Sequence, residues 1–304
     1  MNCLVCERAL QDRNRPYHPH CAQVLFGSSF VPAIGFAYAD IPTEAQKLIG
    51  KMSISGVQPK LSVVVNKDEK RFSVVPTGGT HILKPTPEAF PFLSENENLC
   101  MNLSREMGIE TPPHGLVKMA DDRLAYVIRR FDRDTVGNKI PVEDFAQLLG
   151  KTDKYDGSVE QIGKFLKRHS CVPFIDTQKL FVRILFFFLM GNGDAHLKNF
   201  AFVWRPAGYR LADGYDIVSS RLAFAKESDE MAITVGGRKN RLVKKDFEDL
   251  AKYLEIADRQ RDRFFEMARA LGANMGAYVR NSFLPQKQRD ELMAIFQERF
   301  ARLF

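Results

Sequence analysis

The stretch Gly193-Asp194-Ala195-His196-Leu197-Lys198-Asn199 sits between two strongly apolar segments, and the rest of the chain can be read outward from it. The segment before it covers residues 180–190, and the segment after it covers residues 200–204. Apolar runs of these lengths around a short polar stretch predict a buried helix, a turn and a strand. Such a turn would present Asp194 and Asn199 together, while the apolar flanks fix its backbone.

An Asp followed five residues later by an Asn has two interpretations. In the catalytic loop of protein kinases, the Asp accepts the proton of the attacking hydroxyl and the Asn holds a metal ion. Asp and Asn are also common in ordinary turns, because their side chains bond nearby backbone amides. The spacing alone favours the plain turn, so the surrounding sequence has to decide.

The overall composition is that of a globular protein. The chain has 304 residues, of which 45% are hydrophobic and 27% charged, which fits one large or two modest domains. The longest apolar run, residues 184–190, is too short for a membrane span and predicts a buried helix, and no signal peptide is evident. Five cysteines without a paired framework indicate a reducing compartment, so we expect a cytoplasmic protein with no membrane partner.

The net charge of +7 permits nucleic-acid binding. However, the basic residues are spread along the chain and interleaved with Asp and Glu. This pattern favours a basic protein with an anionic ligand or partner over a direct nucleic-acid binder.

Cysteine and histidine residues near the N-terminus have the spacing of a zinc knuckle: Cys3-x-x-Cys6 is followed by His18-x-x-Cys21. Each pair could bind from one turn, although His20 could replace His18. Because the motif stands alone, we favour a small N-terminal ribbon whose cysteines pack without metal. Zinc held by Cys3, Cys6, His18 and Cys21 is the alternative.

The first half of the chain is rich in strand signals. Residues 51–60 contain Ser53, Ser55 and Gly56 between lysines, and this turn could bring backbone amides up to phosphates, although it lacks the Walker pattern. An ordinary β-turn is the alternative.

Strands are expected at residues 61–66, 71–76 and 78–85. Lys84 would lie on the third of them, where it is costly unless paired; a kinase uses such a lysine to hold nucleotide phosphates. A strand-end lysine that reaches solvent is the alternative.

Residues 94–134 predict a helix and then two strands. Ser94-x-x-Glu97 has the pattern of a capping box, and Gly108 would end the helix at about residue 107. Glu95 and Glu97 could pair with Lys84, but we favour solvated acids stabilised by the helix dipole. Strands follow at residues 116–119 and 124–128, and the second continues into residues 129–134. If the chain has two lobes, this segment crosses between them.

From residue 141 onward the pattern becomes mainly helical. A hairpin after the central turn ends in Asp213-Gly214-Tyr215-Asp216. A kinase needs a second magnesium ligand at this point, and both Asp213 and Asp216 qualify by position. The basic stretch 238–245 is interpreted as a solvated loop. The expected helices cover residues 143–150, 158–169, 177–190, 246–271 and 286–304, and the hairpin strands cover residues 200–204 and 209–212.

Taken together, these motifs resemble the HipA-type serine/threonine kinase toxins of bacterial toxin–antitoxin systems. The resemblance extends from about residue 50 to residue 220. The matching stretches are Ser53-Ile54-Ser55-Gly56-Val57-Gln58-Pro59-Lys60, Thr80-His81-Ile82-Leu83-Lys84, Arg130-Phe131-Asp132-Arg133, Glu143-Asp144, Gly193-Asp194-Ala195-His196-Leu197-Lys198-Asn199-Phe200 and Tyr215-Asp216-Ile217-Val218-Ser219.

The resemblance implies an α+β, two-lobed protein-kinase-like fold with Mg-ATP chemistry. The implied divisions are an N-terminal Cys/His segment at residues 1–50, a strand-rich N-lobe at 51–133 and a mainly helical C-lobe at 134–304. Asp194 would be the general base, Asn199 and Asp216 the metal ligands, and Lys84 the phosphate ligand. The other implied nucleotide-binding residues are Ser55, Gly56, Val57, Gln58, Pro59, Lys60, Arg129, Arg130, Phe131, His196, Lys198 and Tyr215.

The resemblance also implies regulation by autophosphorylation at Ser53 or Ser55. A phosphate there would add roughly two negative charges, which ATP phosphates would repel. The sequence departs from the wider kinase pattern, because it has no His-Arg-Asp or Asp-Phe-Gly tripeptide. Within the family, Ser55 replaces a small apolar residue, and Arg129 replaces an acidic one.

The chain begins close to the Ser/Gly turn, so we expect the family's extra N-terminal subdomain to be absent, as in the short HipT branch. The partners implied for that branch are a small HipS-like protein and a DNA-binding HipB-like antitoxin, with DNA contacted only through the antitoxin. The implied substrate is an aminoacyl-tRNA synthetase, tryptophanyl rather than glutamyl, whose phosphorylation stalls translation and growth. Two alternatives stay open: a small-molecule kinase of the aminoglycoside or choline type, and a non-catalytic module that binds DNA or an antitoxin.

Overall fold

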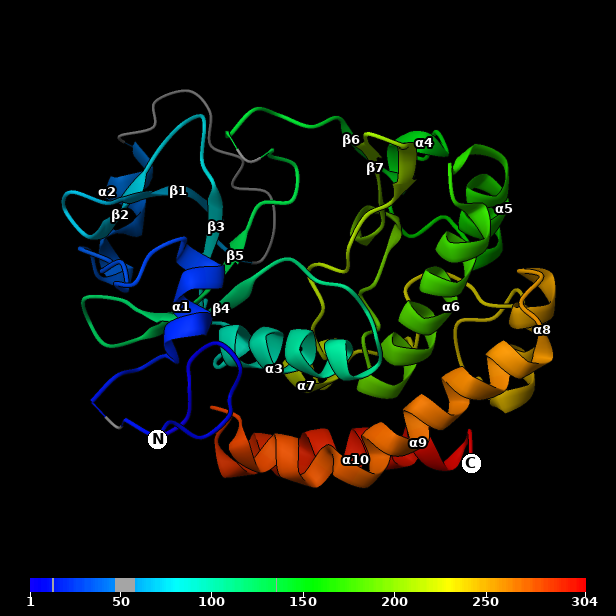
Figure 1. The fold of residues 1–304 in the computed structure, drawn as a ribbon. Helices are drawn as coiled ribbons and strands as arrows, with labels where there is room; N and C mark the ends of the chain where they lie inside the picture. Colours follow the sequence, from blue (N-terminus) through cyan, green and yellow to red (C-terminus); the bar gives the residue numbers. More distant parts are fainter. Residues whose placement is uncertain (13, 47–57, 135) are drawn as a thin grey trace. The chain divides into compact units, whose positions relative to one another are not determined.

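Strand-forming residues in the first half of the chain build one antiparallel sheet in a computed structural model, which describes residues 1–12, 14–46, 58–134 and 136–304 (Figure 1). The strand order is β2-β1-β3-β5-β4, so β3 is the central strand. In β1, Leu61 and Val63 are buried and their neighbours are less so, which is the alternation that a strand with one covered face requires. The strands are β1 (Leu61–Asn66), β2 (Arg71–Val74), β3 (His81–Pro85), β4 (His114–Lys118) and β5 (Leu124–Arg129).

The chain divides into two compact units. The first unit consists of Met1–Leu99, Pro112–Lys139 and Asn281–Leu284. The second unit consists of Cys100–Thr111, Ile140–Arg280 and Pro285–Phe304.

In the first unit, the N-terminal segment packs on the sheet. The side chain of Tyr17 donates a hydrogen bond to the Leu116 carbonyl at 2.7 Å, and the ring of Phe26 meets that of Phe72 edge-on at 5.9 Å. Gly115 on β4 is required by this packing, because a Cβ there would lie 2.8 Å from the side chain of Val5. The helical elements that begin in this unit are α1 (Pro19–Phe26), η1 (Tyr38–Asp40), α2 (Ile41–Gln46) and α3 (Leu93–Glu106).

In the second unit, α6 (Pro173–Met190) is the central helix. All of its residues from Leu180 to Met190 are buried, so this helix is enclosed on every side rather than on one face. Helices α5 (Val159–His169) and α10 (Gln286–Ala301) pack against it (Figure 1). The remaining helical elements are α4 (Phe145–Leu148), η2 (Leu197–Asn199), α7 (Ser220–Ala223), α8 (Lys244–Tyr253) and α9 (Asp258–Asn281).

A small three-stranded sheet completes the second unit, in the order β6-β7-β8. The hairpin expected after the central turn is present, as β7 (Ala201–Arg205) and β8 (Gly208–Leu211). The mixed α+β class, with an antiparallel sheet early in the chain and helices later, is therefore confirmed.

Three expected elements differ from the structure. Residues 142–144 pair with β7 as strand β6 (Val142–Asp144), and Asp144 caps the short helix that follows, so the helix expected at 143–150 starts later. The helix expected at 246–271 is two helices, α8 and α9, separated at Leu254–Ala257. Ser94 lies inside α3 rather than at its cap. For residues 142–144 and for Ser94, a tertiary contact overrides the local signal: the pairing with β7 and the bond from Ser94 to the Lys84 carbonyl.

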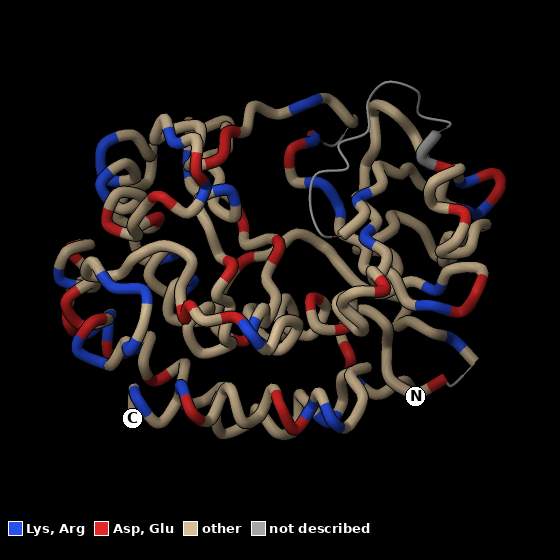
Figure 2. Tube along the Cα trace, turned by 180° about the vertical axis from the view of Figure 1, so that it is seen from behind, with Lys and Arg blue, Asp and Glu red and all other residues tan. Residues whose placement is uncertain are grey.

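Basic and acidic residues are interspersed on both units, as Figure 2 shows. In the stretch 238–245, Arg238 pairs with Asp246 and Lys245 with Asp249, so acids compensate part of its positive charge. Its last two residues begin helix α8, so the solvated loop expected at 238–245 ends before Lys244. Within the described residues, no helix combines the length and apolar character that crossing a membrane requires.

Candidate active site

The turn after α6 is shaped by its own polar atoms. The helix ends at Gly191, whose left-handed backbone (φ 65°) turns the chain. The Asp194 carbonyl then accepts from the His196 amide at 2.8 Å, and the Asn199 side-chain oxygen accepts from the same amide at 3.0 Å. The Asp194 side chain is exposed while Asn199 is buried. The turn therefore presents one carboxylate to solvent on a fixed backbone.

Tyr155 is the hydrogen-bond partner of Asp194. Its hydroxyl donates to a carboxylate oxygen of Asp194 at 2.6 Å. Burial, followed by this bond to a carboxylate, raises the pKa of Tyr155 above its usual value, so the phenol stays protonated and donating. Sequence reasoning missed Tyr155, because it lies 39 residues before Asp194 in a turn with no motif of its own.

Asn199 and Asp216 meet although 17 residues separate them. The Asn199 amide nitrogen donates to an Asp216 carboxylate oxygen at 3.3 Å. Asp216 adopts a left-handed backbone conformation (φ 57°), which non-glycine residues rarely take and which is common at functional sites. Asp213, the other candidate, instead lines a cavity of about 250 Å³ together with Lys179 and Arg183. The structure therefore places Asp216, and not Asp213, beside Asn199.

The other residues predicted near the turn also lie there. His196 is buried, and burial followed by the nearby Lys154 charge lowers its pKa, so its ring is neutral at pH 7. Its ring meets Tyr155 edge-on at 5.4 Å. Lys198 is exposed, and its carbonyl accepts from the Tyr215 hydroxyl at 2.9 Å.

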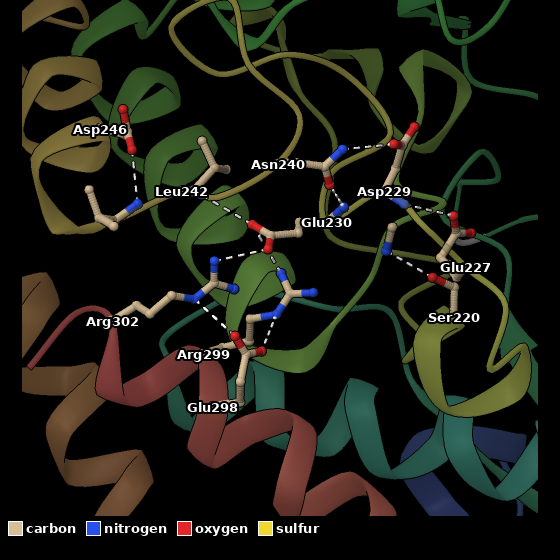
Figure 3. Close-up of polar contacts among 12 residues, drawn as sticks. Ser220, Glu227, Asp229, Glu230, Asn240, Leu242, Asp246, Glu298, Arg299 and Arg302 are labelled. Carbon is tan, nitrogen blue, oxygen red and sulfur yellow. Dashed lines mark hydrogen bonds and ion pairs between the residues drawn. The ribbon is translucent and has the colours of Figure 1, made fainter.

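A polar network behind the turn holds its first residue. The Gly193 amide donates to the Ser220 hydroxyl at 2.8 Å, and a Cβ on Gly193 would lie 2.3 Å from the Asp229 carbonyl oxygen. Figure 3 shows the loop that carries Asp229 tied to α10 through Glu230, which pairs with Arg299 at 3.5 Å and Arg302 at 2.9 Å. The loop therefore has little freedom to move away from Gly193.

In the first unit, Lys84 forms a buried ion pair with Glu97 of α3. The lysine nitrogen lies 2.6 Å from a glutamate oxygen, and the two residues are 4% and 0% exposed. The ammonium also lies 5.4 Å from the centre of the Tyr126 ring. The alternative of a strand-end lysine in solvent is wrong.

The acids at the start of α3 are buried, so the prediction that they are solvated is wrong. Glu97 binds Lys84, and Glu95 is only 7% exposed. Burial raises the pKa of Glu95 to about 7. The capping interpretation of Ser94 is also wrong, because its hydroxyl donates to the Lys84 carbonyl at 3.0 Å. Ser94 and Glu97 thus both bind Lys84, which lies on the central strand β3.

Part of the predicted Ser/Gly turn can be located. Gln58 donates from its side chain to the Pro85 carbonyl at 3.1 Å, next to Lys84 on β3. Pro59 and Lys60 follow and lead into β1. The predictions for Ser53, Ser55, Gly56 and Val57 concern residues outside the part of the chain that the structure describes.

The segment from Arg129 to Phe131, which is predicted to bind the nucleotide, lies at the end of β5. The Arg129 amide donates to the Pro113 carbonyl at 2.8 Å, and the Arg130 amide donates to the Thr80 carbonyl at 2.9 Å. The Arg130 side chain forms two bonds to Asp132, at 2.8 and 2.6 Å. Both amides are thus used within the first unit, and Phe131 follows them directly.

The donor set of the second unit suits a magnesium ion. Asp216 offers a carboxylate, and the Asn199 amide oxygen keeps one lone pair beside the bond that it accepts from the His196 amide. Such hard oxygen ligands are those that Mg²⁺ prefers, and this ion retains water and binds phosphate oxygens for the rest of its shell. In the first unit, Lys84 offers the positive charge that suits an anion such as a nucleotide phosphate.

Several curated proteins share sequence with this chain. A protein of Haemophilus influenzae named "Putative kinase" is 38% identical over 205 residues, covering 62% of this chain and 59% of the relative. The "Serine/threonine-protein kinase toxin HipA" of Shewanella oneidensis is 29% identical over 190 residues, covering 56% and 43%. The chain therefore spans about half the length of these relatives.

Two solved structures share the fold. HipA in the Shewanella oneidensis complex of HipA, HipB and operator DNA aligns with a TM-score of 0.67 at 21% identity, covering 83% of this chain and 64% of that chain. The Helicobacter pylori proinflammatory kinase CtkA aligns with a TM-score of 0.53 at 14% identity, covering 83% and 91%. At these identities the likeness concerns the fold, which is that of HipA and CtkA. Residues 52–278 also match the model of the HipA-like C-terminal domain, so the chain belongs to this family.

Proposed function

We propose that this chain is a Mg-ATP-dependent serine/threonine protein kinase that acts as the toxin of a bacterial toxin–antitoxin system. The observation that carries the proposal is the second unit's turn: Asp194 is exposed and oriented by Tyr155, and Asn199 lies beside Asp216. An exposed carboxylate next to a pair of hard oxygen ligands is the arrangement that phosphoryl transfer to a hydroxyl needs.

The roles follow from this geometry. Asp194 accepts the proton of the acceptor hydroxyl, and Tyr155 keeps the carboxylate in one orientation. Asn199 and Asp216 would hold a magnesium ion, which would neutralise charge on the phosphates. Lys84 binds the phosphates, and its ion pair with Glu97 fixes the position of the lysine nitrogen. His196 and Lys198 lie next to Asp194 in the turn, and Tyr215 holds the turn's backbone.

The test is phosphate incorporation from labelled Mg-ATP, followed by intact-mass spectrometry. Asp194→Asn should reduce incorporation by about 10²–10⁴-fold, the usual contribution of a general base. The amide can still accept the Tyr155 bond, so the fold should be kept. Asp216→Asn should also lower incorporation, and its matched control is Asp213→Asn, which changes the same residue type three positions away. Equal losses of phosphate incorporation in Asp216→Asn and Asp213→Asn would contradict the role of Asp216. Full activity in Asp194→Asn would contradict the role of Asp194.

The regulation, partners and substrate that we propose rest on the family. We infer autophosphorylation at Ser53 or Ser55, assignment to the HipT branch and a cytoplasmic location. The Shewanella HipA structure contains HipB and operator DNA, which supports a HipB-like antitoxin here, together with a HipS-like protein. The proposed substrate is an aminoacyl-tRNA synthetase, tryptophanyl rather than glutamyl. Incubating purified synthetases with the chain and labelled ATP tests this, with Asp194→Asn as the inactive control.

A further inference from the structure

Four potential metal ligands near the N-terminus converge on one point of the first unit. The ligand atoms of Cys3, Cys6, His18 and Cys21 all lie within 4.8 Å of one another. The Cys6 and Cys21 sulfurs lie 3.4 and 3.9 Å from the His18 Nδ1. In a tetrahedral zinc site, bond lengths of about 2.3 Å to sulfur and 2.05 Å to nitrogen place sulfur and nitrogen about 3.6 Å apart. The cluster therefore already has nearly the dimensions that the ion requires.

The histidine is held in the form that binds a metal. His18 Nε2 lies 3.1 Å from the Ala9 carbonyl, and a carbonyl can only accept, so Nε2 carries the hydrogen. In the neutral ring, the lone pair is then on Nδ1, which faces the sulfurs of Cys6 and Cys21. A bond from the second ring nitrogen to a carbonyl is the usual way in which a protein orients a ligating histidine.

The backbone fixes both halves of the cluster. Cys3 and Cys6 belong to one tight turn, in which the Glu7 amide donates to the Cys3 carbonyl at 2.9 Å and Glu7 adopts a φ of 58°. His18 and Cys21 lie at the start of α1. The His18 amide is directed at the Cys3 sulfur, 3.5 Å away. Such a preorganised set of ligands lowers the cost of binding a metal ion.

We propose that Cys3, Cys6, His18 and Cys21 bind one structural zinc ion. Three sulfurs and one imidazole are a common ligand set of closed, structural zinc sites, and four protein ligands leave no position for a substrate. This replaces our sequence-based preference for cysteines that pack without metal, and it selects His18 over His20, which is exposed and outside the cluster.

The position of the cluster indicates what the ion stabilises. The segment that carries it is bonded to the sheet: the Leu116 amide of β4 donates to the Leu4 carbonyl at 2.7 Å. At the far end of α1, His81 Nε2 donates to the Leu25 carbonyl at 2.8 Å. His81 is on β3, three residues before Lys84. Zinc would therefore fix the layer that packs on the edge strand β4 and the central strand β3.

The test is the zinc content of the purified full-length chain, prepared under reducing conditions without chelators and measured by elemental mass spectrometry. We expect about one zinc ion per chain in the wild type. Cys21→Ser should lower the zinc content at least about tenfold, since a site with one ligand fewer binds the metal far less tightly. His18→Cys should retain zinc, because it keeps four ligands.

Two control variants change residues that are not in the cluster but have the same residue types as the proposed ligands. His20→Ala and Cys171→Ser should both retain wild-type zinc, because His20 lies outside the cluster and Cys171 is a free, exposed cysteine. In the wild type, a strong chelator should remove the zinc and lower the melting temperature by several degrees, and added zinc should restore it.

The outcomes that would overturn the proposal are separate from kinase activity. A wild-type chain that binds no zinc even after incubation with the metal, with its thiols kept reduced, excludes the site. Zinc that Cys21→Ser retains in full belongs elsewhere in the chain. If Cys21→Ser does not fold, the wild-type content and its retention in His18→Cys still decide the question.

Discussion

A lysine buried on a central strand is costly unless its charge is compensated, and Glu97 provides that compensation for Lys84. The sequence predicted that Lys84 lies on a strand, but it favoured a solvated Glu97 over an ion pair. The reason is that Glu97 also has the position of a first-turn acid. The pair alone does not show whether it is present for stability or for function. A pair of variants can separate the two.

Lys84→Met should lower the free energy of unfolding by about 3–5 kcal/mol, because it leaves Glu97 buried without this cation. Adding Glu97→Leu should recover much of that loss, because neither charge of the pair then remains buried. Phosphate transfer should stay lost in the double variant, since the phosphate ligand is absent. Urea unfolding and transfer from labelled ATP measure the two effects.

The control for this pair is Lys118→Met, which removes an exposed lysine from β4 of the same sheet. It should change stability by less than about 1 kcal/mol, as expected for an exposed ion pair. A double variant that is stable and also transfers phosphate at the wild-type rate would show that Lys84 serves the fold only.

At the level of the element, the turn after α6 depends on a close approach of two backbones. The Gly193 Cα lies so near the Asp229 carbonyl that a Cβ would be 2.3 Å from its oxygen. The loop of Asp229 is tied to α10 through Glu230 and its two arginines (Figure 3). A Cβ added at Gly193 would therefore displace the turn rather than the loop of Asp229.

Gly193→Ala should shift Asp194 and lower phosphate transfer at least about tenfold, because small misplacements of a reacting group are costly. The melting temperature should fall as well, since the overpacked contact costs about 1–3 kcal/mol. Steady-state kinetics and thermal unfolding measure these effects. Gly35→Ala is the control, because a Cβ on Gly35 would have no neighbour within 4 Å. Wild-type kinetics in Gly193→Ala would mean that the turn tolerates the shift.

At the level of the whole molecule, the buried Glu95 links folding to pH. Burial raises its pKa from 4.5 to about 7, so the folded chain binds this proton more tightly than the unfolded chain. The stability that this proton contributes is complete below about pH 4.5 and is lost as the pH rises through about 7. Above that, the folded state carries a buried charge.

Glu95→Gln should therefore stabilise the protein at pH 8 more than at pH 5, by about 2 kcal/mol. The amide resembles the protonated acid and does not titrate. Melting temperatures of the variant and the wild type at both pH values test this. Glu88→Gln changes an exposed glutamate, and its melting temperature should differ from that of the wild type by the same small amount at pH 5 and at pH 8. An equal effect of Glu95→Gln at pH 5 and pH 8 would show that Glu95 does not carry this proton.

From residue 61 onward, the sequence by itself determined most of the order of strands and helices, including the buried helix α6 and the polar turn that follows it. These features depend on periodicity and turn chemistry, which act over a few neighbouring residues. For the same reason, α8 and α9 were expected as one helix, since no local signal marks the break at Leu254–Ala257 strongly enough.

Only the tertiary structure decided which distant residues meet. It placed Asp216 rather than Asp213 beside Asn199, and Tyr155 against Asp194. It also paired Glu97 with Lys84, and it gathered His18 rather than His20 with the three cysteines. Each choice lies between residues that are nearly equivalent in local sequence. The choice depends on strand register, helix position and backbone turns, and these are fixed by the packing of segments that lie far apart in the chain.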